Sequence, residues 1–227
     1  RDRGVFRPAP RPLAMTDLAF EVLGDRIEPH AAVPTIMLRL RATEADGLRI
    51  HAAILRCQIR IEPKKRHYNR SEEERLLELF GETPQWGDSL RPFLWTHVST
   101  ALGSFVGSTE FELPIECTYD FEVAAAKYLH ALGDGDIPLV LLFSGTLFAG
   151  PGGGFAAERV SWGAEPSYRL PVSTWRSVMD AYFPNSGWLR LHRDTLDRLQ
   201  RFRVQRALPT WDCAIERLLK EAGVEEP

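Results

Sequence analysis

The sequence predicts an α+β fold, in which a mostly antiparallel β-sheet or sandwich over residues 15–162 is followed by a C-terminal group of packed helices over 171–222. Alternating apolar and polar residues dominate the first of these regions, and helical spacing of apolar residues dominates the second. Two long strands, 35–41 and 48–61, are joined by a short turn that ends at Gly47. Two long antiparallel strands with a glycine turn favour a sandwich or curled sheet over a βαβ fold.

Composition bounds the class of protein. The chain has 227 residues, of which 44% are hydrophobic and 26% charged, and this is typical of a globular protein that can bury a core. A formal net charge of −3 gives no overall attraction to nucleic acid. No apolar run reaches the roughly 18 residues of a membrane span. We expect one globular domain over 15–227, preceded by a disordered basic arm over 1–14 that holds four arginines and three prolines.

The cysteines and the N-terminal residues both favour the cytoplasm. Cys57, Cys117 and Cys213 are odd in number, lie far apart in the sequence and are flanked by apolar or strand-like residues. We therefore expect reduced, buried thiols that react with a thiol reagent only after denaturation. Residues 1–14 lack the apolar segment of a secretory signal. A cytoplasmic location is the resulting prediction.

The strand over 48–61 has two different faces. Its odd positions from Ala53 to Ile61 are apolar throughout, so this face is expected to lie in the core. Its even positions begin apolar and end polar, so that face is expected to emerge into solvent or against a partner. The even positions are, in order, Ile50, Ala52, Ile54, Arg56, Gln58 and Arg60.

A basic loop over 62–70 follows this strand and leads into a helix over 71–80. Ser71 is the expected N-cap, and Glu74 would complete a capping box with it. Gly81 is the expected end of the helix.

The remaining elements are assigned from alternation, helical spacing and turn residues. The longest apolar stretch, 137–148, follows a Gly-Asp-Gly-Asp turn and is expected to be a strand buried on both faces. The others are a strand at 18–23, a loop at 83–92, an irregular or short helical segment at 93–102, a strand at 105–118, a helix at 121–132 capped by Asp120 and ended by Gly133, a strand at 155–162, and helices at 175–183, 188–206 and 211–222.

No motif specifies catalysis. The glycine run at 150–154 lacks the Gly-Lys-Ser/Thr ending of a phosphate loop, and Ser144 lacks a complete nucleophile elbow. The six histidines never occur at metal-binding spacing. The carboxylates Glu116, Asp120 and Glu122 could divide acid and base roles, but helix capping explains them more simply. We therefore predict no catalytic residue, cofactor or metal site, and a non-catalytic protein in preference to an enzyme.

One candidate partner-binding surface stands out. Basic residues continue from the even face of the strand at 48–61 into the loop at 62–70, with Tyr68 among them. Such a patch can meet phosphates or an acidic partner. The simpler interpretation is a solvated loop neutralised by Glu72, Glu73 and Glu74. The candidate residues are Arg56, Gln58, Arg60, Lys64, Lys65, Arg66, His67 and Tyr68.

Three segments carry a resemblance to a known family. They are LRCQIRIEPKKRHY, YDFEVAAAKYLHAL with GDIPLVLLFSGTLF, and PVSTWRSVMDAYFP with WLRLHRDTLDRL. The chain resembles a bacterial family of unknown function whose genes often lie beside nickel-iron uptake hydrogenase genes. The likeness covers nearly all of the chain after Met15, and no catalytic residue is carried over because none is defined for the family.

Two hypotheses from different classes follow. The first is a non-catalytic accessory or assembly protein that binds another protein, and the resemblance implies a hydrogenase subunit or maturation factor as that partner. The alternative is a small-ligand-binding module, or an enzyme whose site is assembled from scattered residues. Weak nucleic-acid binding through residues 56–70 ranks below both, because neither the charge excess nor a stacking motif supports it.

Overall fold

A computed structural model describes residues 15–117, 123–150, 156–160, 165–184, 186 and 190–224. The chain divides into two compact units, Arg1–Gly187 and Trp188–Pro227. The predicted α+β class is confirmed, since antiparallel sheets occupy the first unit and helices cluster toward the C-terminus. The expected N-terminal arm over 1–14 lies outside the described residues.

The first unit contains two sheets. Sheet A has the order β1-β9-β8-β4-β5, with β10 also paired to β8 and β6 to β4, and sheet B has the order β2-β3-β7. All pairs are antiparallel except β1 with β9. The strands of sheet A are β1 (Met15–Thr16), β4 (Arg49–Ile61), β5 (Phe93–Leu102), β6 (Phe105–Val106), β8 (Asp136–Ala149), β9 (Ala156–Val160) and β10 (Ser167–Pro171), and those of sheet B are β2 (Leu18–Ile27), β3 (Thr35–Glu44) and β7 (Ser108–Glu116).

The two sheets pack face to face as a sandwich with an apolar interior. The odd positions of β4, from Ala53 to Ile61, are fully or almost fully buried, as the alternation predicted. Phe20 of β2 stacks on Phe143 of β8 with ring centroids 4.0 Å apart, which joins sheet B to sheet A. Burial of these alternating side chains is the main apolar contribution to stability.

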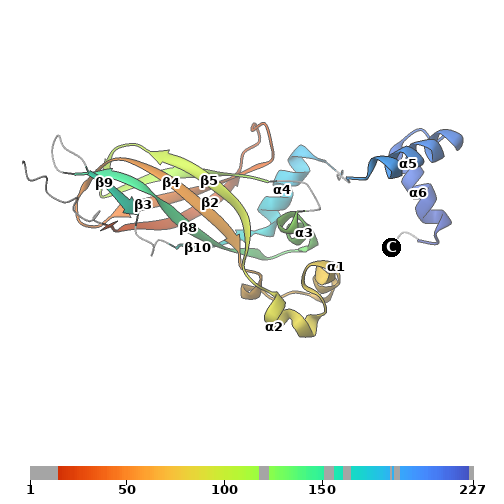
Figure 1. Ribbon diagram of the computed structural model, residues 1–227, viewed down its shortest axis with the longest axis horizontal. Helices are drawn as coiled ribbons and strands as arrows, with labels where there is room; N and C mark the ends of the chain where they lie inside the picture. The colour runs from red at the N-terminus through yellow and green to blue at the C-terminus, as the bar shows by residue number, and fades with distance from the viewer. Residues whose placement is uncertain are drawn as a thin grey trace, which may run out of the picture. The chain divides into compact units, whose positions relative to one another are not determined.

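Helices gather at one end of the sandwich (Figure 1). Tyr128 of α3 is completely buried there, between the rings of Tyr68, Phe80 and Phe93. These elements are the 3₁₀ helices Pro63–Lys65 and Thr83–Gln85 and the α-helices α1 (Arg70–Phe80), α2 (Trp86–Ser89), α3 (Ala124–Ala131) and α4 (Val172–Tyr182).

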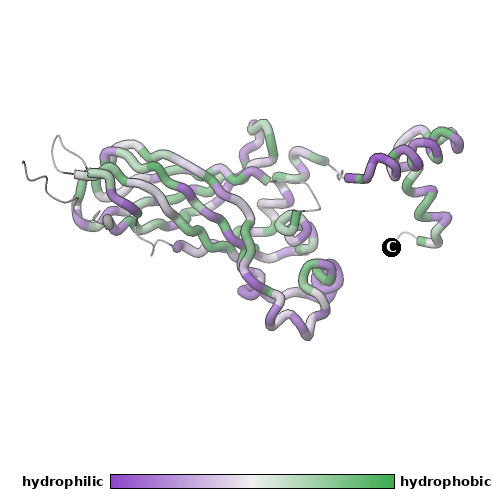
Figure 2. The backbone as a smooth tube through the Cα atoms, in the orientation of Figure 1, coloured by the Kyte–Doolittle hydropathy of each residue, from purple (hydrophilic) through white to green (hydrophobic). Residues whose placement is uncertain are grey.

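The second unit is a pair of helices, α5 (Arg193–Gln205) and α6 (Trp211–Glu221). Thr210 caps α6, accepting a hydrogen bond from the Cys213 amide at 3.1 Å. Arg203 lies over the Trp211 ring, 4.3 Å from its centroid, and links the two helices. Figure 2 shows α5 as mostly hydrophilic, and no described residue of this helix is buried.

Three details of the helices and loops differ from the sequence prediction. Asn69, and not Ser71, is the N-cap of α1, and Glu72 completes the capping box in place of Glu74. Residues 86–89 of the predicted loop form α2, around the buried Trp86. The helix at 121–132 is shorter, with Leu132 instead of Gly133 at its C-cap, and Asp120 lies outside the described residues.

Three further differences concern strands. Residues 93–102 are a strand, because they pair along β4. Residues 167–171 form β10, a strand that the sequence did not indicate. The strand at 137–148 is buried along one face, whereas on the other Pro138 is buried, Val140 and Leu142 are half-buried and Ser144 is exposed. The second face is therefore partly open to solvent.

The thiols differ in exposure, and this gives a first prediction. Cys57 and Cys117 are buried, and burial raises the pKa of each to about 12, whereas Cys213 is half-buried. We expect iodoacetamide to modify Cys213 in the native protein, and to modify Cys57 and Cys117 only after denaturation. Mass spectrometry of the digested protein measures this. Rapid native labelling of Cys57 or Cys117 would contradict the core assignment.

Candidate functional site

The outer face of sheet A, which points away from sheet B, carries four arginines. Residues paired across antiparallel strands lie on the same face of a sheet. Arg56 lies between Ser99 and Ser144, and Arg60 between Leu94 and Val140. Arg159 of β9 is paired with Thr146, and Arg169 of β10 with Pro138, so both belong to the same face. We call these four residues and the outer-face residues between them the arginine face.

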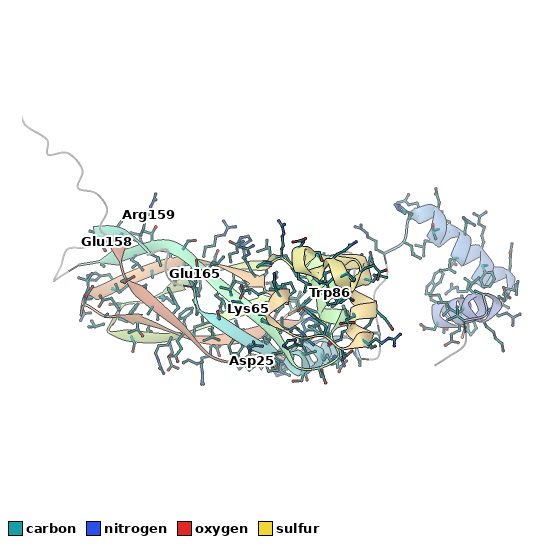
Figure 3. The ribbon with its side chains drawn as sticks, turned by 90° about the horizontal axis from the view of Figure 1, so that it is seen from below. Asp25, Lys65, Trp86, Glu158, Arg159 and Glu165 are labelled. Atoms are coloured by element: carbon teal, nitrogen blue, oxygen red, sulfur yellow. The ribbon has the colours of Figure 1, made fainter. Side chains whose placement is uncertain are left out.

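Within its paired strands the arginine face holds no carboxylate, but the exposed Glu165, two residues before β10, lies on the same side of sheet A, between Arg159 and Lys65 in Figure 3. Toward the helices it ends at Glu62 and Asp136, and Glu62 pairs with Lys65 at 2.5 Å. Figure 3 labels Arg159 near the end of the sandwich away from the helices, and Lys65 nearer to them. The other members of the face are neutral or histidine: Ala52, Ile54, Gln58, Leu94, His97, Ser99, Ala101, Pro138, Val140, Leu142, Ser144, Thr146, Phe148, Ala157 and Ser167.

The outer face of sheet B is arranged differently, because its charges neutralise one another. Arg26 pairs with Glu112 and Glu28 at 2.8 and 2.7 Å, and Arg41 pairs with Glu110 at 2.8 Å. Hydrogen bonds from Arg26 hold the pKa of Glu28 and Glu112 below the usual range of a glutamate. Exposed pairs of this kind add little stability. They do show that arginines on this face have carboxylate partners within the fold.

Exposed apolar groups accompany the arginines. Ile54 is 58% exposed and Leu94 43% exposed, and each is directly beside an arginine position on the face. Arg56 is exposed and has no ion pair within the described part of the chain. Arginine combined with exposed apolar side chains is the composition enriched at protein interfaces.

The strand half of the predicted surface lies on the arginine face. Arg56, Gln58 and Arg60 share it, and the Arg60 Nη2 donates to the Pro92 carbonyl oxygen at 3.1 Å. Sequence reasoning missed Arg159 and Arg169, which come from strands about one hundred residues further along. Alternation over 156–160 and 167–171 was the only available signal, and it becomes informative once the pairing with β8 is known.

The loop half of the predicted surface is used mainly within the fold. Lys64 donates to the Gly87 carbonyl oxygen at 3.2 Å, and Lys65 pairs with Glu62. The Arg66 side chain is only 7% exposed. Tyr68 is half-buried, donates to the Pro63 carbonyl oxygen at 2.7 Å and contacts the Tyr128 hydroxyl at 2.8 Å. His67 is exposed.

Arg66 and Glu72 form a buried ion pair that connects four segments. The Arg66 Nη2 donates to Glu72 Oε1 at 2.7 Å, and the guanidinium also donates to the carbonyl oxygens of Asp134 and Asp136 at 3.0 Å each. Glu72 accepts further hydrogen bonds from the backbone N–H groups of Gly133 at 2.6 Å and Asn69 at 3.1 Å. Burial alone would raise the pKa of Glu72, but these backbone donors and Arg66 outweigh it and lower that pKa.

A hollow of about 300 Å³ lies at the edge of the arginine face. It is at the small end of the range for ligand pockets. Besides Arg169, the charged residues that line the hollow are Glu62 and Lys65, and these two form an ion pair with each other. Its lining residues are Glu62, Lys65, Pro138, Leu139, Ser167, Tyr168 and Arg169.

Neither a metal centre nor a membrane-spanning helix is present in the described part of the chain. Within the described ranges, no group of three or more His, Cys, Asp or Glu side chains is placed to hold a metal ion. No helix formed by the described residues has both the length and the apolar character needed to cross a membrane.

Fold and surface together define an α+β protein with a β-sandwich whose outer face on one sheet is basic. Residues 15–227 match DUF6084, a family of unknown function, and the chain belongs to that family. Among solved structures, the chain is similar to the solution structure of a putative late embryogenesis abundant (LEA) protein. The identity is 15%, over 68% of this chain and 71% of that chain, with a TM-score of 0.29. The curated proteins contain no significant match.

Proposed function

We propose that this protein is a non-catalytic accessory or assembly protein that binds another protein through the arginine face. The observation that carries the proposal is the contrast between the two sheets. Arg26 and Arg41 on sheet B are paired with glutamates, whereas Arg56 and Arg159 on sheet A form no ion pair with a carboxylate among the described residues. The face carries four arginines against the exposed Glu165, and this excess of positive charge attracts an acidic surface.

The partner surface is expected to be acidic with some apolar contact. Arg56 and Arg60 are four residues apart on one strand, which places their backbones about 13 Å from each other. Complementary charge over such a distance mainly raises the rate of association and selects the partner. The exposed Ile54 and Leu94 would supply the apolar part of the contact.

A hydrogenase subunit or maturation factor is the partner we propose. This part of the proposal is supported by the resemblance of the three sequence segments to a family whose genes lie beside nickel-iron hydrogenase genes. Acidic patches on either kind of protein would fit the arginine face. Affinity purification from the native host, followed by mass spectrometry, identifies the partner.

Charge reversal on the face is the direct test. We expect Arg56→Glu with Arg60→Glu to weaken partner capture about tenfold at low salt, and less at high salt, because salt screens the attraction. Stability should fall by only about 1 kcal/mol, since the double variant removes a single side-chain hydrogen bond of the described structure, from Arg60 to the Pro92 carbonyl oxygen. Quantitative capture at two salt concentrations and a thermal melt measure the two effects.

Arg39→Glu is the matched control. Arg39 is also an exposed arginine at the middle of a strand, but it lies on the outer face of sheet B, opposite Glu112. The single variants Arg56→Glu and Arg39→Glu carry the same change in charge. If both variants capture the partner equally well, the arginine face is not the binding site. A large loss of stability in Arg56→Glu would mean that this arginine is structural.

A further inference from the structure

Strand β5 is the outermost long strand of sheet A. It pairs with β4 along one edge, and within the described residues no backbone hydrogen bond reaches its other edge from a further strand. Trp95 forms a bulge in β5, because Ile59 is paired with Thr96 and the next residue, Arg60, is paired with Leu94. Beyond this bulge the pairing is regular from Thr96 to Leu102. An unpaired regular edge is able to accept one more strand.

The other long edges of the sandwich carry protective features, whereas β5 has only the bulge at Trp95 and none from Thr96 to Leu102. β7 has Pro114 and three glutamates, and β2 contains a bulge at Leu23, between Val22 and Gly24. Charged residues, proline and bulges discourage pairing with a foreign strand. β10 is five residues long and ends in Pro171. The sequence of β5, FLWTHVSTAL, contains no proline, lysine or carboxylate.

The arginine face continues to this edge. Arg56 is paired with Ser99 of β5, and Arg60 with Leu94, so both arginines are one strand away from the free edge. A strand added beside β5 would lie about 4.8 Å further out, within reach of long arginine and glutamate side chains. Its outward residues would lie beside His97 and Ser99, and its inward residues beside the half-buried Val98 and Thr100.

This geometry indicates the chemistry of a segment that could bind at the free edge of β5, and the inference rests on the proposed function. We propose that the partner contributes an extended acidic segment, with carboxylate and apolar side chains alternating, which adds to β5 as a further strand of sheet A. Backbone hydrogen bonds to β5 would supply affinity, and the carboxylates facing Arg56 and Arg60 would select the sequence. Docking by strand addition also fixes the direction and register of the bound segment.

A library of random twelve-residue peptides displayed on phage, selected on the full-length protein, tests the chemistry. The expected result is enrichment of peptides that are acidic at every second position and free of proline in their centre. Backbone amide exchange, followed by NMR with the best peptide, should slow at least about tenfold at alternate amides of residues 96–101, because these gain a hydrogen-bond partner. Enriched peptides without acidic alternation, or binding that leaves the β5 amides unchanged, would overturn the proposal. If the same amides become protected when only the protein concentration is raised, the edge binds a second copy of this chain. That result would also overturn the proposal.

Paired proline variants separate this proposal from the proposed function. Successive residues of a strand direct their N–H groups to opposite edges, so one of Ser99 and Thr100 points its amide outward. Amide exchange in the free protein identifies it as the faster of the two. Proline at that position should leave the β4 pairing intact and weaken capture of the native partner about tenfold, whereas proline at the other should destabilise β5.

The combined outcomes distinguish the two proposals. If Arg56→Glu weakens capture and the outward proline does not, the arginine face binds the partner without strand addition. If the outward proline weakens capture and Arg56→Glu does not, the edge binds the partner and the arginine face is excluded. Unchanged capture in both folded variants would exclude both. A thermal melt confirms that each variant is folded before capture is measured.

Discussion

Glu72→Ala is expected to lower the free energy of unfolding by about 3–5 kcal/mol, the usual effect of breaking one side of a buried ion pair. The side chains of Glu72 and Arg66 are 1% and 7% exposed, so the variant would leave a buried guanidinium without its carboxylate. The backbone N–H groups of Asn69 and Gly133 would lose their acceptor at the same time. Urea denaturation of the variant and the parent protein measures the difference.

The pH dependence of stability follows from the same carboxylate. The pKa of Glu72 is lowered in the folded protein, so its contribution is fully present above about pH 4.3, the ordinary value for an unfolded glutamate. The contribution is lost as the pH falls through the folded pKa. Stability of the parent protein should therefore fall below about pH 4.3 more steeply than that of Glu72→Ala.

Glu74→Ala is the control for this variant. Glu74 is 68% exposed and pairs only with the exposed Arg70 among the described residues, so its removal should cost less than about 0.5 kcal/mol. Comparing the stability losses at Glu72 and Glu74 also distinguishes the observed capping box, which uses Glu72, from the one predicted from sequence, which uses Glu74. Comparable losses at Glu72 and Glu74 would contradict the buried network.

Gly145→Ala is expected to destabilise the protein by about 3 kcal/mol, at the upper end of the usual cost of overpacking. A Cβ atom at Gly145 would lie 2.1 Å from the carbonyl oxygen of Ile54 on the neighbouring strand. This oxygen belongs to the backbone of β4, so it cannot move away as a flexible side chain would. The strain would fall on the pairing of β4 with β8, the two longest strands of sheet A.

Gly103→Ala is the matched control, because a Cβ atom at Gly103 would meet no other atom within 4 Å. We expect it to change stability by less than about 0.5 kcal/mol. The difference between the two variants in urea denaturation is the quantity to measure. A Gly145→Ala protein as stable as Gly103→Ala would mean that β4 and β8 pair less closely at this point.

Period-two alternation predicted β4, whose pairing with β8 is regular over most of its length, and missed β5, whose pairing with β4 is interrupted by a bulge. β4 could be assigned from its odd positions, because its register continues without a break from Ala52 to Ile61. β5 was misread because the bulge at Trp95 shifts its alternation, so that three apolar residues, Phe93, Leu94 and Trp95, come in succession. A bulge depends on the neighbouring strand, which local sequence does not reveal.

The choice of helix cap shows a similar limit. Asn69 with Glu72 and Ser71 with Glu74 both have the spacing of a capping box. Glu72 is selected because Arg66 and the Gly133 amide bind the same carboxylate, and Gly133 is 61 residues away in the sequence. Local spacing therefore predicted a helix with a capping box, and tertiary contacts determined which residues form it.

The candidate surface was predictable on one strand only. The change from Ile54 to Arg56 on the even face of β4 is visible in the sequence, and these residues do lie on the exposed face. Their continuation through Arg159 and Arg169 requires the pairing of β8 with β9 and β10. The hydrogen bonds that the loop from Lys64 to Tyr68 makes within the fold could not be predicted, because acceptors such as the Gly87 and Asp134 carbonyl oxygens are distant in sequence.

A photo-crosslinking residue placed at Ser99 tests most directly whether the arginine face binds a protein. Ser99 is exposed beside Arg56 on this face, and Ser108 is an equally small, exposed residue on the outer face of sheet B. After irradiation in the native host, we predict a covalent adduct between another protein and the Ser99 variant, its loss when Arg56→Glu is added, and none with the Ser108 variant. An adduct at Ser108 without one at Ser99, or an adduct at Ser99 that Arg56→Glu leaves unchanged, would contradict the account.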